Sequence, residues 1–291
     1  ELYKNNLNIS DRATGILYYD CTNYFFEIED EDEFRKYGPS KEHRPNPIIQ
    51  MGLFMDGNGI PLAFNINSGN TNEQQTLTPL EEKIIQDFKL SKFVVCTDAG
   101  LASTDNRKFN DKGERAFITT QSIKQLKKYL KDWALSPSNW KLTGSDKTYN
   151  INSVQEKLEN TTDETKKQKI KNLTFYKERW INENGLEQRL IVTFSFKYQQ
   201  YQRHIREGQI ERAKKAIENK NFKLDKRKQT DFKRFIKQTN ITSDGEVADK
   251  GILSIDMNII AKEELFDGFY GVCTNLEDNV KEIIKVNHRR W

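Results

Sequence analysis

The strongest folding signal in this chain is a turn between two apolar runs, at residues 48–55 and 60–67. The turn has the sequence Asp56-Gly57-Asn58-Gly59, and glycine and asparagine tolerate the positive φ angles of a tight β-hairpin. Residues 14–29 are rich in β-branched and aromatic side chains, which favours one long strand or two short ones. The first 67 residues therefore predict three successive antiparallel strands.

Helices and strands alternate after residue 71. Apolar side chains in residues 77–88 recur at helical spacing, and residues 92–97 form a continuous apolar run typical of a strand buried on both faces. A short polar helix is expected at residues 104–110 and another strand at residues 116–120. The order β-β-β-α-β-α-β predicts an α/β fold, with a mixed sheet of antiparallel and then parallel strands flanked by helices.

The second half of the chain is less regular. We expect a helix at residues 123–133, strands at 173–180 and 190–196 joined by a turn, and a long amphipathic helix at 198–217. A returning strand is predicted at residues 268–274. A helix should follow it, with Asn275 as the N-cap.

Charge is distributed unevenly, although the net charge of the 291 residues is only +4. Residues 124–266 contain 30 Lys and Arg against 20 Asp and Glu, whereas the remainder contains 17 against 23. A basic segment is expected where part of a protein meets a polyanion such as nucleic acid; a solvated charged insertion is the alternative. The candidate DNA contacts, unless they only form solvated helix faces, are Lys226, Arg227, Lys228, Lys233 and Arg234.

The cellular compartment is suggested by three features. No stretch approaches the roughly 18 apolar residues that a membrane helix needs. The cysteines, Cys21, Cys96 and Cys273, lie in short apolar runs and cannot all pair, which favours reduced thiols. The chain begins without a charged and apolar leader, so we expect a cytoplasmic protein whose N-terminus is itself cut from a longer chain.

Two aspartates are the candidate catalytic residues. Asp20 interrupts a strand of apolar residues, and Asp98 follows the carboxyl end of another, where open α/β sheets usually place their sites. Either one alone could be a cap or turn residue. If their strands are neighbours, however, the two carboxylates converge and suit a hard cation such as Mg²⁺ or Mn²⁺. Such sites commonly hold two ions about 3.5–4 Å apart and transfer phosphoryl groups, which suggests chemistry on a phosphodiester.

The sequence resembles the DDE transposases of bacterial insertion sequences, in the branch with a Tyr-x2-Arg-x3-Glu-x6-Lys signature. Residues 18–22 look like the strand of the first aspartate, residues 97–100 like the Asp-x-Gly box of the second, and residues 267–275 like the strand before the signature helix. The catalytic core of that family is similar to ribonuclease H and retroviral integrase. The resemblance implies three parts: the first part of the core at 1–123, a basic insertion at 124–266, and the return strand with the start of the last catalytic helix at 267–291.

The resemblance also implies an activity. Two Mg²⁺ (or Mn²⁺) ions would be held by Asp20, Asp98 and a glutamate. The enzyme would hydrolyse a phosphodiester at each element end, and the freed 3′-hydroxyl would then attack target DNA. Arg290 would contact a DNA phosphate. The partner is double-stranded DNA, both element ends and target, and the active form is expected to be a homodimer in the bacterial cytoplasm.

Two departures from the family pattern are visible at the C-terminus. Asn287 stands where the signature Tyr is expected, a change predicted to alter DNA contacts. The signature Glu is expected at position 294, and the chain ends at Trp291, which predicts an inactive core. The alternatives are a non-catalytic DNA-binding protein with this fold and a metal-dependent nuclease without transposition.

Overall fold

The computed structural model describes residue 5 and residues 11–219, 231–241 and 247–290. These residues belong to two compact units. Unit 1 comprises Glu1–Gln125, Glu178–Val192 and Tyr270–Trp291, and unit 2 comprises Leu126–Lys177 and Thr193–Phe269. No helix in the described part of the chain is long and apolar enough to cross a lipid bilayer.

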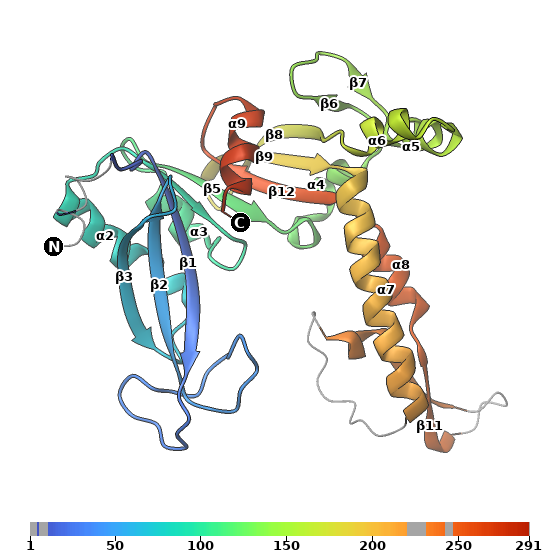
Figure 1. Ribbon diagram of the computed structural model, residues 1–291, viewed down its shortest axis with the longest axis horizontal. Helices are drawn as coiled ribbons and strands as arrows, with labels where there is room; N and C mark the ends of the chain where they lie inside the picture. Colours follow the sequence, from blue (N-terminus) through green and yellow to red (C-terminus); the bar gives the residue numbers. More distant parts are fainter. Residues whose placement is uncertain (1–4, 6–10, 220–230, 242–246, 291) are drawn as a thin grey trace. The chain divides into compact units, whose positions relative to one another are not determined.

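Unit 1 begins with the three antiparallel strands that the sequence predicts: β1 (Ile16–Phe25), β2 (Ile48–Asp56) and β3 (Pro61–Ser68) (Figure 1). The turn between β2 and β3 is closed by the Asp56 carboxylate, which accepts hydrogen bonds from the main-chain N–H groups of Asn58 and Ile60. Gly59 lies in this turn with a φ of +79°. Both features agree with the predicted hairpin.

Parallel strands continue the sheet. β4 (Val94–Thr97) pairs in parallel with β1, and β5 (Ala116–Gln121) in parallel with β4. β12 (Phe269–Thr274) is antiparallel to β5, and β9 (Leu186–Phe194) and β8 (Phe175–Glu183) follow. The strand order in unit 1 is β3-β2-β1-β4-β5-β12-β9-β8, so the predicted mixed sheet is confirmed.

Helices cover both faces of this sheet in unit 1. Successive side chains of a strand point to opposite faces. Odd-numbered residues of β1 pack in the core against α2 (Leu77–Phe88), and the cluster includes Leu17, Tyr19, Cys21, Phe54, Leu77, Leu80 and Ile84. On the other face, the Tyr18 hydroxyl donates to the Val286 carbonyl of α9 (Val280–His288) at 3.2 Å. The short helix α3 (Thr104–Phe109) connects β4 and β5.

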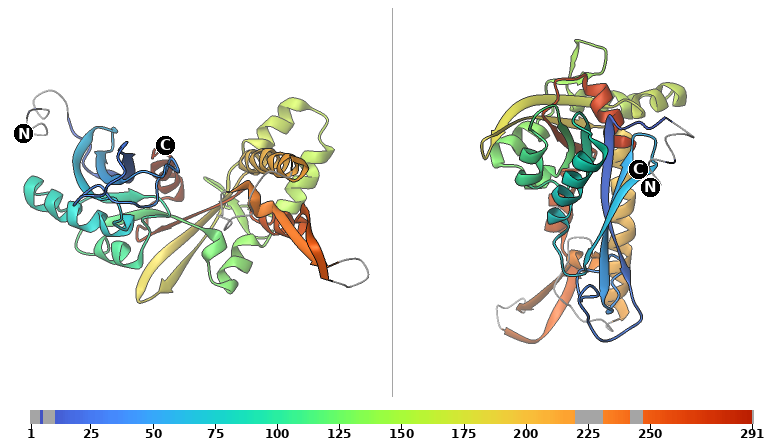
Figure 2. Two further views of the ribbon diagram at one scale, coloured as in Figure 1. Left: turned by 90° about the horizontal axis from the view of Figure 1, so that it is seen from below. Right: turned by 90° about the vertical axis from the view of Figure 1, so that its left-hand side faces the viewer.

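Unit 2 combines small strands with helices on either side of the long helix α7 (Phe196–Asn219) (Figures 1 and 2). It also contains α4 (Lys128–Leu135), β6 (Trp140–Leu142), β7 (Thr148–Tyr149), α5 (Ile151–Asn160), α6 (Glu164–Lys171), β10 (Ile236–Ile241), β11 (Val247–Ile255) and α8 (Met257–Glu264). Trp140 is fully buried against the rings of Phe194 and Phe269. A second core joins Ala213 of α7 with Phe235, Ile236 and Ile260.

Two predicted helix boundaries are wrong. Residues 123–133 do not form one helix: a 3-10 turn, η2 (Ile123–Gln125), precedes α4, and Lys127 between them has extended backbone with a ψ of 150°. The final helix is capped by Asn279 instead of Asn275. The Asn275 side chain is engaged elsewhere, because its Oδ1 accepts from the Phe117 main-chain N–H at 3.0 Å.

Candidate active site

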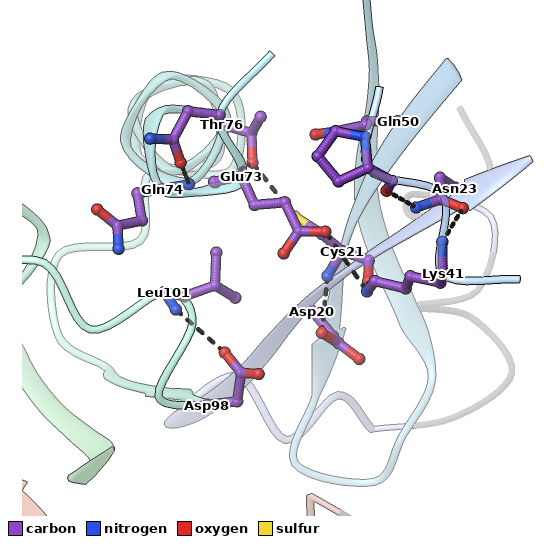
Figure 3. Close-up of polar contacts among 12 residues, drawn as sticks. Asp20, Cys21, Asn23, Lys41, Gln50, Glu73, Gln74, Thr76, Asp98 and Leu101 are labelled. Carbon is purple, nitrogen blue, oxygen red and sulfur yellow. Dashed lines mark hydrogen bonds and ion pairs between the residues drawn. The ribbon is translucent and has the colours of Figure 1, made fainter. Parts of the chain in front are cut away.

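Asp20 lies in β1, and Asp98 directly follows the neighbouring parallel strand β4. β1 and β4 pair with Tyr18 opposite Cys96, and the same register carried two residues further sets Asp20 level with Asp98. β4 ends at Thr97, so Asp98 begins the turn that follows, while β1 continues past it. Figure 3 shows the two carboxylates at this edge of the sheet. The predicted neighbouring strands therefore bring the two aspartates together.

The carboxylate of Asp98 is oriented by its own turn. Its Oδ1 accepts a hydrogen bond from the main-chain N–H of Leu101 at 3.1 Å (Figure 3). The Thr119 hydroxyl donates to the Asp98 main-chain carbonyl at 3.2 Å, and the Thr97 hydroxyl donates to Thr119 at 2.9 Å. A Cβ at Gly100 would lie 3.4 Å from Asp98 Oδ1, which is an ordinary van der Waals distance.

Asp20 is exposed in the middle of β1. Its Oδ1 accepts from the main-chain N–H of Cys21 at 2.8 Å. Strand alternation places Asp20 on the same face of the sheet as Tyr18. Near the start of β1, α9 covers this face and contacts Tyr18. Neither aspartate is buried, so a cation can reach both carboxylates from solvent.

Asn287 fastens α9 to this face. Its side chain is fully buried, its Nδ2 donates to the Tyr270 hydroxyl at 3.1 Å, and its Oδ1 lies 4.0 Å from the Cys96 thiol. The Tyr270 hydroxyl is also 2.7 Å from the Thr120 hydroxyl, to which Arg290 Nη2 donates at 3.4 Å. Asn287 thus contacts protein groups, and the prediction that it alters DNA contacts has no direct contact to support it.

Lys41 and Glu73 are polar neighbours of Asp20 that sequence analysis missed. The Lys41 ammonium donates to the main-chain carbonyl of Cys21 and lies 3.6 Å from Glu73 Oε1 (Figure 3). Lys41 comes from the loop between β1 and β2, and Glu73 from the short helix η1 (Glu73–Gln75). Neither belongs to a periodic pattern, so no sequence signal marks them.

The predicted DNA-binding residues are spread over several environments. Lys226, Arg227 and Lys228 lie outside the described residues. Lys233 and Arg234 are half-buried in η3 (Phe232–Phe235) of unit 2. The Arg234 guanidinium donates to both carboxylate oxygens of Glu263, at 2.8 and 3.1 Å, and stacks on the Phe235 ring. Their role in DNA binding stays a prediction.

The donor set fits a hard divalent cation. Carboxylate oxygens are the ligands that Mg²⁺ and Mn²⁺ prefer, with water and phosphate oxygens completing the coordination. Within the described residues, no group of three or more His, Cys, Asp and Glu side chains is placed to hold a metal ion. The role of Asp20 and Asp98 as metal ligands stays a prediction.

Comparison with known proteins gives the family. A search of curated proteins finds no match to the chain. Among solved structures, the chain is similar to a cryo-EM structure of the piggyBac transposase synaptic complex with hairpin DNA, at 13% identity and a TM-score of 0.30. That alignment covers 61% of this chain and 30% of the other, so the chain spans less than a third of that transposase.

A family model gives the stronger result. The model described as transposase DDE domain matches residues 25–242, about three quarters of the sequence. The matched segment contains Asp98, and it begins five residues after Asp20. The chain belongs to the family of transposase DDE domains.

Proposed function

We propose that this chain is the core of a DNA transposase that holds Mg²⁺ or Mn²⁺, in two ions when complete, between Asp20 and Asp98. The observation that carries the proposal is the parallel pairing of β1 with β4, in which Tyr18 lies opposite Cys96 and each of these residues precedes one of the aspartates by two positions. Membership of the transposase DDE domain family supports it. The substrate is double-stranded DNA, cleaved at element ends and then joined through the freed 3′-hydroxyl to target DNA.

The chain's own residues would act by positioning and charge. The β1–β4 pairing supports a shared role for Asp20 and Asp98. The Thr119 hydroxyl, which accepts from Thr97, donates to the Asp98 carbonyl and so helps to fix the turn that carries Asp98. Bound divalent ions would activate the attacking oxygen and stabilise the leaving oxygen of a phosphodiester. Arg290 is half-exposed beside Thr120 and is proposed to contact a DNA phosphate.

Further parts of the proposal follow from the family resemblance. The proposal includes a third carboxylate, the signature glutamate of the family; α9 contacts Tyr18 of β1 and Cys96 of β4 near both aspartates. The basic insertion at 124–266, between a core at 1–123 and the final strand and helix at 267–291, would add contacts to DNA. A homodimer in the bacterial cytoplasm is the proposed active form.

Metal-dependent nicking of supercoiled plasmid by the full-length protein tests the proposal. We expect Asp98→Asn and Asp20→Asn each to reduce nicking by about 100-fold or more, since each removes a charge that a cation requires. Binding to duplex DNA should change by less than about twofold, and the melting temperature should stay within a few degrees. The matched control is Asp87→Asn at an exposed site of α2, which should nick normally.

The reaction products separate the alternatives. Nicks accompanied by joined 3′ ends support transposition, and nicks without joined ends indicate a nuclease. DNA binding without metal-dependent nicking by the full-length protein would indicate a non-catalytic DNA-binding protein. Loss of DNA binding and of the folded state together in Asp98→Asn would mean that Asp98 is structural and would overturn the assignment.

A further inference from the structure

The loop that carries Lys41 is fixed to β1 beside the candidate site. Asn23 is nearly buried, and its side chain makes two hydrogen bonds with this loop. Its Nδ2 donates to the Pro39 carbonyl at 3.2 Å, and its Oδ1 accepts from the Lys41 main-chain N–H at 3.2 Å (Figure 3). The main chain of Lys41 is therefore fixed beside β1, the strand that holds Asp20.

The Lys41 ammonium ends next to Asp20. It donates to the carbonyl of Cys21, the residue that follows Asp20, and pairs with Glu73. An ammonium group has three N–H donors. The side chain keeps 45% of its surface exposed, so the ammonium can also meet a ligand that approaches Asp20 from solvent.

Glu73 is held in turn by the end of η1. The buried Thr76 donates both its hydroxyl and its main-chain N–H to the Glu73 carbonyl, at 2.7 and 3.1 Å. An ion pair this exposed contributes little to stability, with a median of about 0–1 kcal/mol. Stability is therefore a weak reason for placing this pair beside the aspartates, whereas fixing the direction of the ammonium is a specific effect.

We propose that Lys41 binds a non-bridging oxygen of the DNA phosphodiester that lies against Asp20, with Glu73 as a positioning residue. Glu73 adds a negative charge beside the metal ligands, and the Lys41 ammonium paired with it offsets that charge where a phosphodiester approaches. Lysine is a compact point charge that suits a single phosphate oxygen. The inference rests on the proposed function, because it takes the same DNA as the ligand.

The test compares charge-removing and charge-keeping variants of the full-length protein. Lys41→Met keeps the aliphatic stem and removes the charge, Lys41→Arg keeps the charge, and Lys83→Met removes an exposed lysine of α2 as the matched control. One readout is plasmid nicking with Mg²⁺ or Mn²⁺. The other is the salt dependence of binding to a labelled mixed-sequence duplex, measured by fluorescence anisotropy over a KCl series.

Loss of one phosphate contact has a defined signature. In Lys41→Met the slope of log K against log salt should become shallower by about 0.9, and nicking should fall by about 10- to 100-fold. Lys41→Arg should keep most of the salt slope and most of the nicking activity. Lys83→Met should change neither the slope nor the nicking. Glu73→Gln should weaken nicking less than Lys41→Met, because the ammonium remains.

An unchanged slope together with unchanged nicking in Lys41→Met overturns the inference. Full nicking by Asp20→Asn and Asp98→Asn would instead refute the proposed function, and the salt slope would still decide whether Lys41 meets phosphate. If Lys41→Met does not fold, the slope of Lys41→Gln decides in the same way. A slope equal to that of the unaltered protein rejects the phosphate contact.

Discussion

Tyr18 and Cys96 lie opposite each other on β1 and β4, and each precedes a candidate catalytic aspartate by two residues. Both also meet α9: the Tyr18 hydroxyl donates to the Val286 carbonyl, and the Cys96 thiol lies 4.0 Å from Asn287 Oδ1. The strand positions that set the register of the aspartates are therefore the ones on which α9 rests. Docking of α9 and alignment of the candidate site depend on the same contacts.

Asn287→Ala tests this docking. The change leaves the half-buried Tyr270 hydroxyl with one fewer partner and opens a gap where the buried Asn287 side chain lay under α9, so we expect a loss of about 1–3 kcal/mol in the free energy of unfolding. Urea denaturation measures the loss, and hydrogen exchange should accelerate most at the amides of α9. Lys285→Ala, on the exposed side of the same helix, should cost no more than about 0.5 kcal/mol. Equal effects of both variants would contradict the role given to Asn287.

Mn²⁺ binding should depend on both aspartates. We expect Asp20→Asn and Asp98→Asn each to weaken Mn²⁺ affinity by at least about tenfold, measured by isothermal titration calorimetry, because each supplies a carboxylate to one site. The double variant should bind hardly worse than either single variant, since residues of one site are not additive. Removal of metal by EDTA should abolish nicking in the unaltered protein. Mn²⁺ affinity that is the same in all three variants would exclude this site.

Glu81 should make unit 1 less stable as the pH rises. Its side chain is fully buried in α2 with a hydrogen bond from Asn110 Nδ2 at 3.0 Å, and burial raises its pKa from 4.5 to about 7. The folded state therefore favours the protonated form, so its contribution to stability is present below pH 4.5 and is lost as the pH rises through 7.

The substitution Glu81→Gln tests whether Glu81 lowers the stability of unit 1 as the pH rises. Glu81 Oε1 and Asn110 Oδ1 are both buried without a hydrogen-bond partner, and a glutamine amide supplies a donor without a charge. The free energy of unfolding of the variant, relative to that of the unaltered protein, should rise on the order of 2–3 kcal/mol from pH 5 to pH 8. Urea denaturation at the two pH values measures this change. Glu114→Gln, at an exposed position of unit 1, should show no such trend. A gain that shrinks with rising pH would contradict the argument.

The Arg206–Asp267 pair should be a major support of unit 2. Both side chains are buried, and the guanidinium donates to the two carboxylate oxygens at 2.7 and 2.6 Å. Asp267→Asn removes the bidentate counter-charge of the buried guanidinium and leaves the exposed Glu264 carboxylate at 3.5 Å, so we expect a loss of about 3–5 kcal/mol in the free energy of unfolding. Removing the exposed partner of Glu211 by Lys214→Ala should cost less than about 1 kcal/mol in the same denaturation assay. A small effect of Asp267→Asn would show that water or another group compensates Arg206.

The part of the fold that local sequence encodes was predictable. The Asp56–Gly59 turn, the helical spacing in α2 and the apolar run of β4 each depend on residues close together in the chain. The same local patterns singled out Asp20 and Asp98, because a charged residue in or next to an apolar strand stands out. The roles of Arg290 and of the basic insertion came from the family resemblance and stay predictions.

Only the tertiary structure decided the rest. Strand register sets Tyr18 opposite Cys96, two residues before each aspartate, and it depends on packing of whole strands that are about 80 residues apart in sequence. Long-range contacts also placed Lys41 at the Cys21 carbonyl, used Asn275 to bind β5 instead of capping a helix, and buried Asn287. Sequence by itself determined which elements form and which residues could carry the chemistry. Packing between distant segments determined which of them meet, because those contact energies have no counterpart in any local pattern.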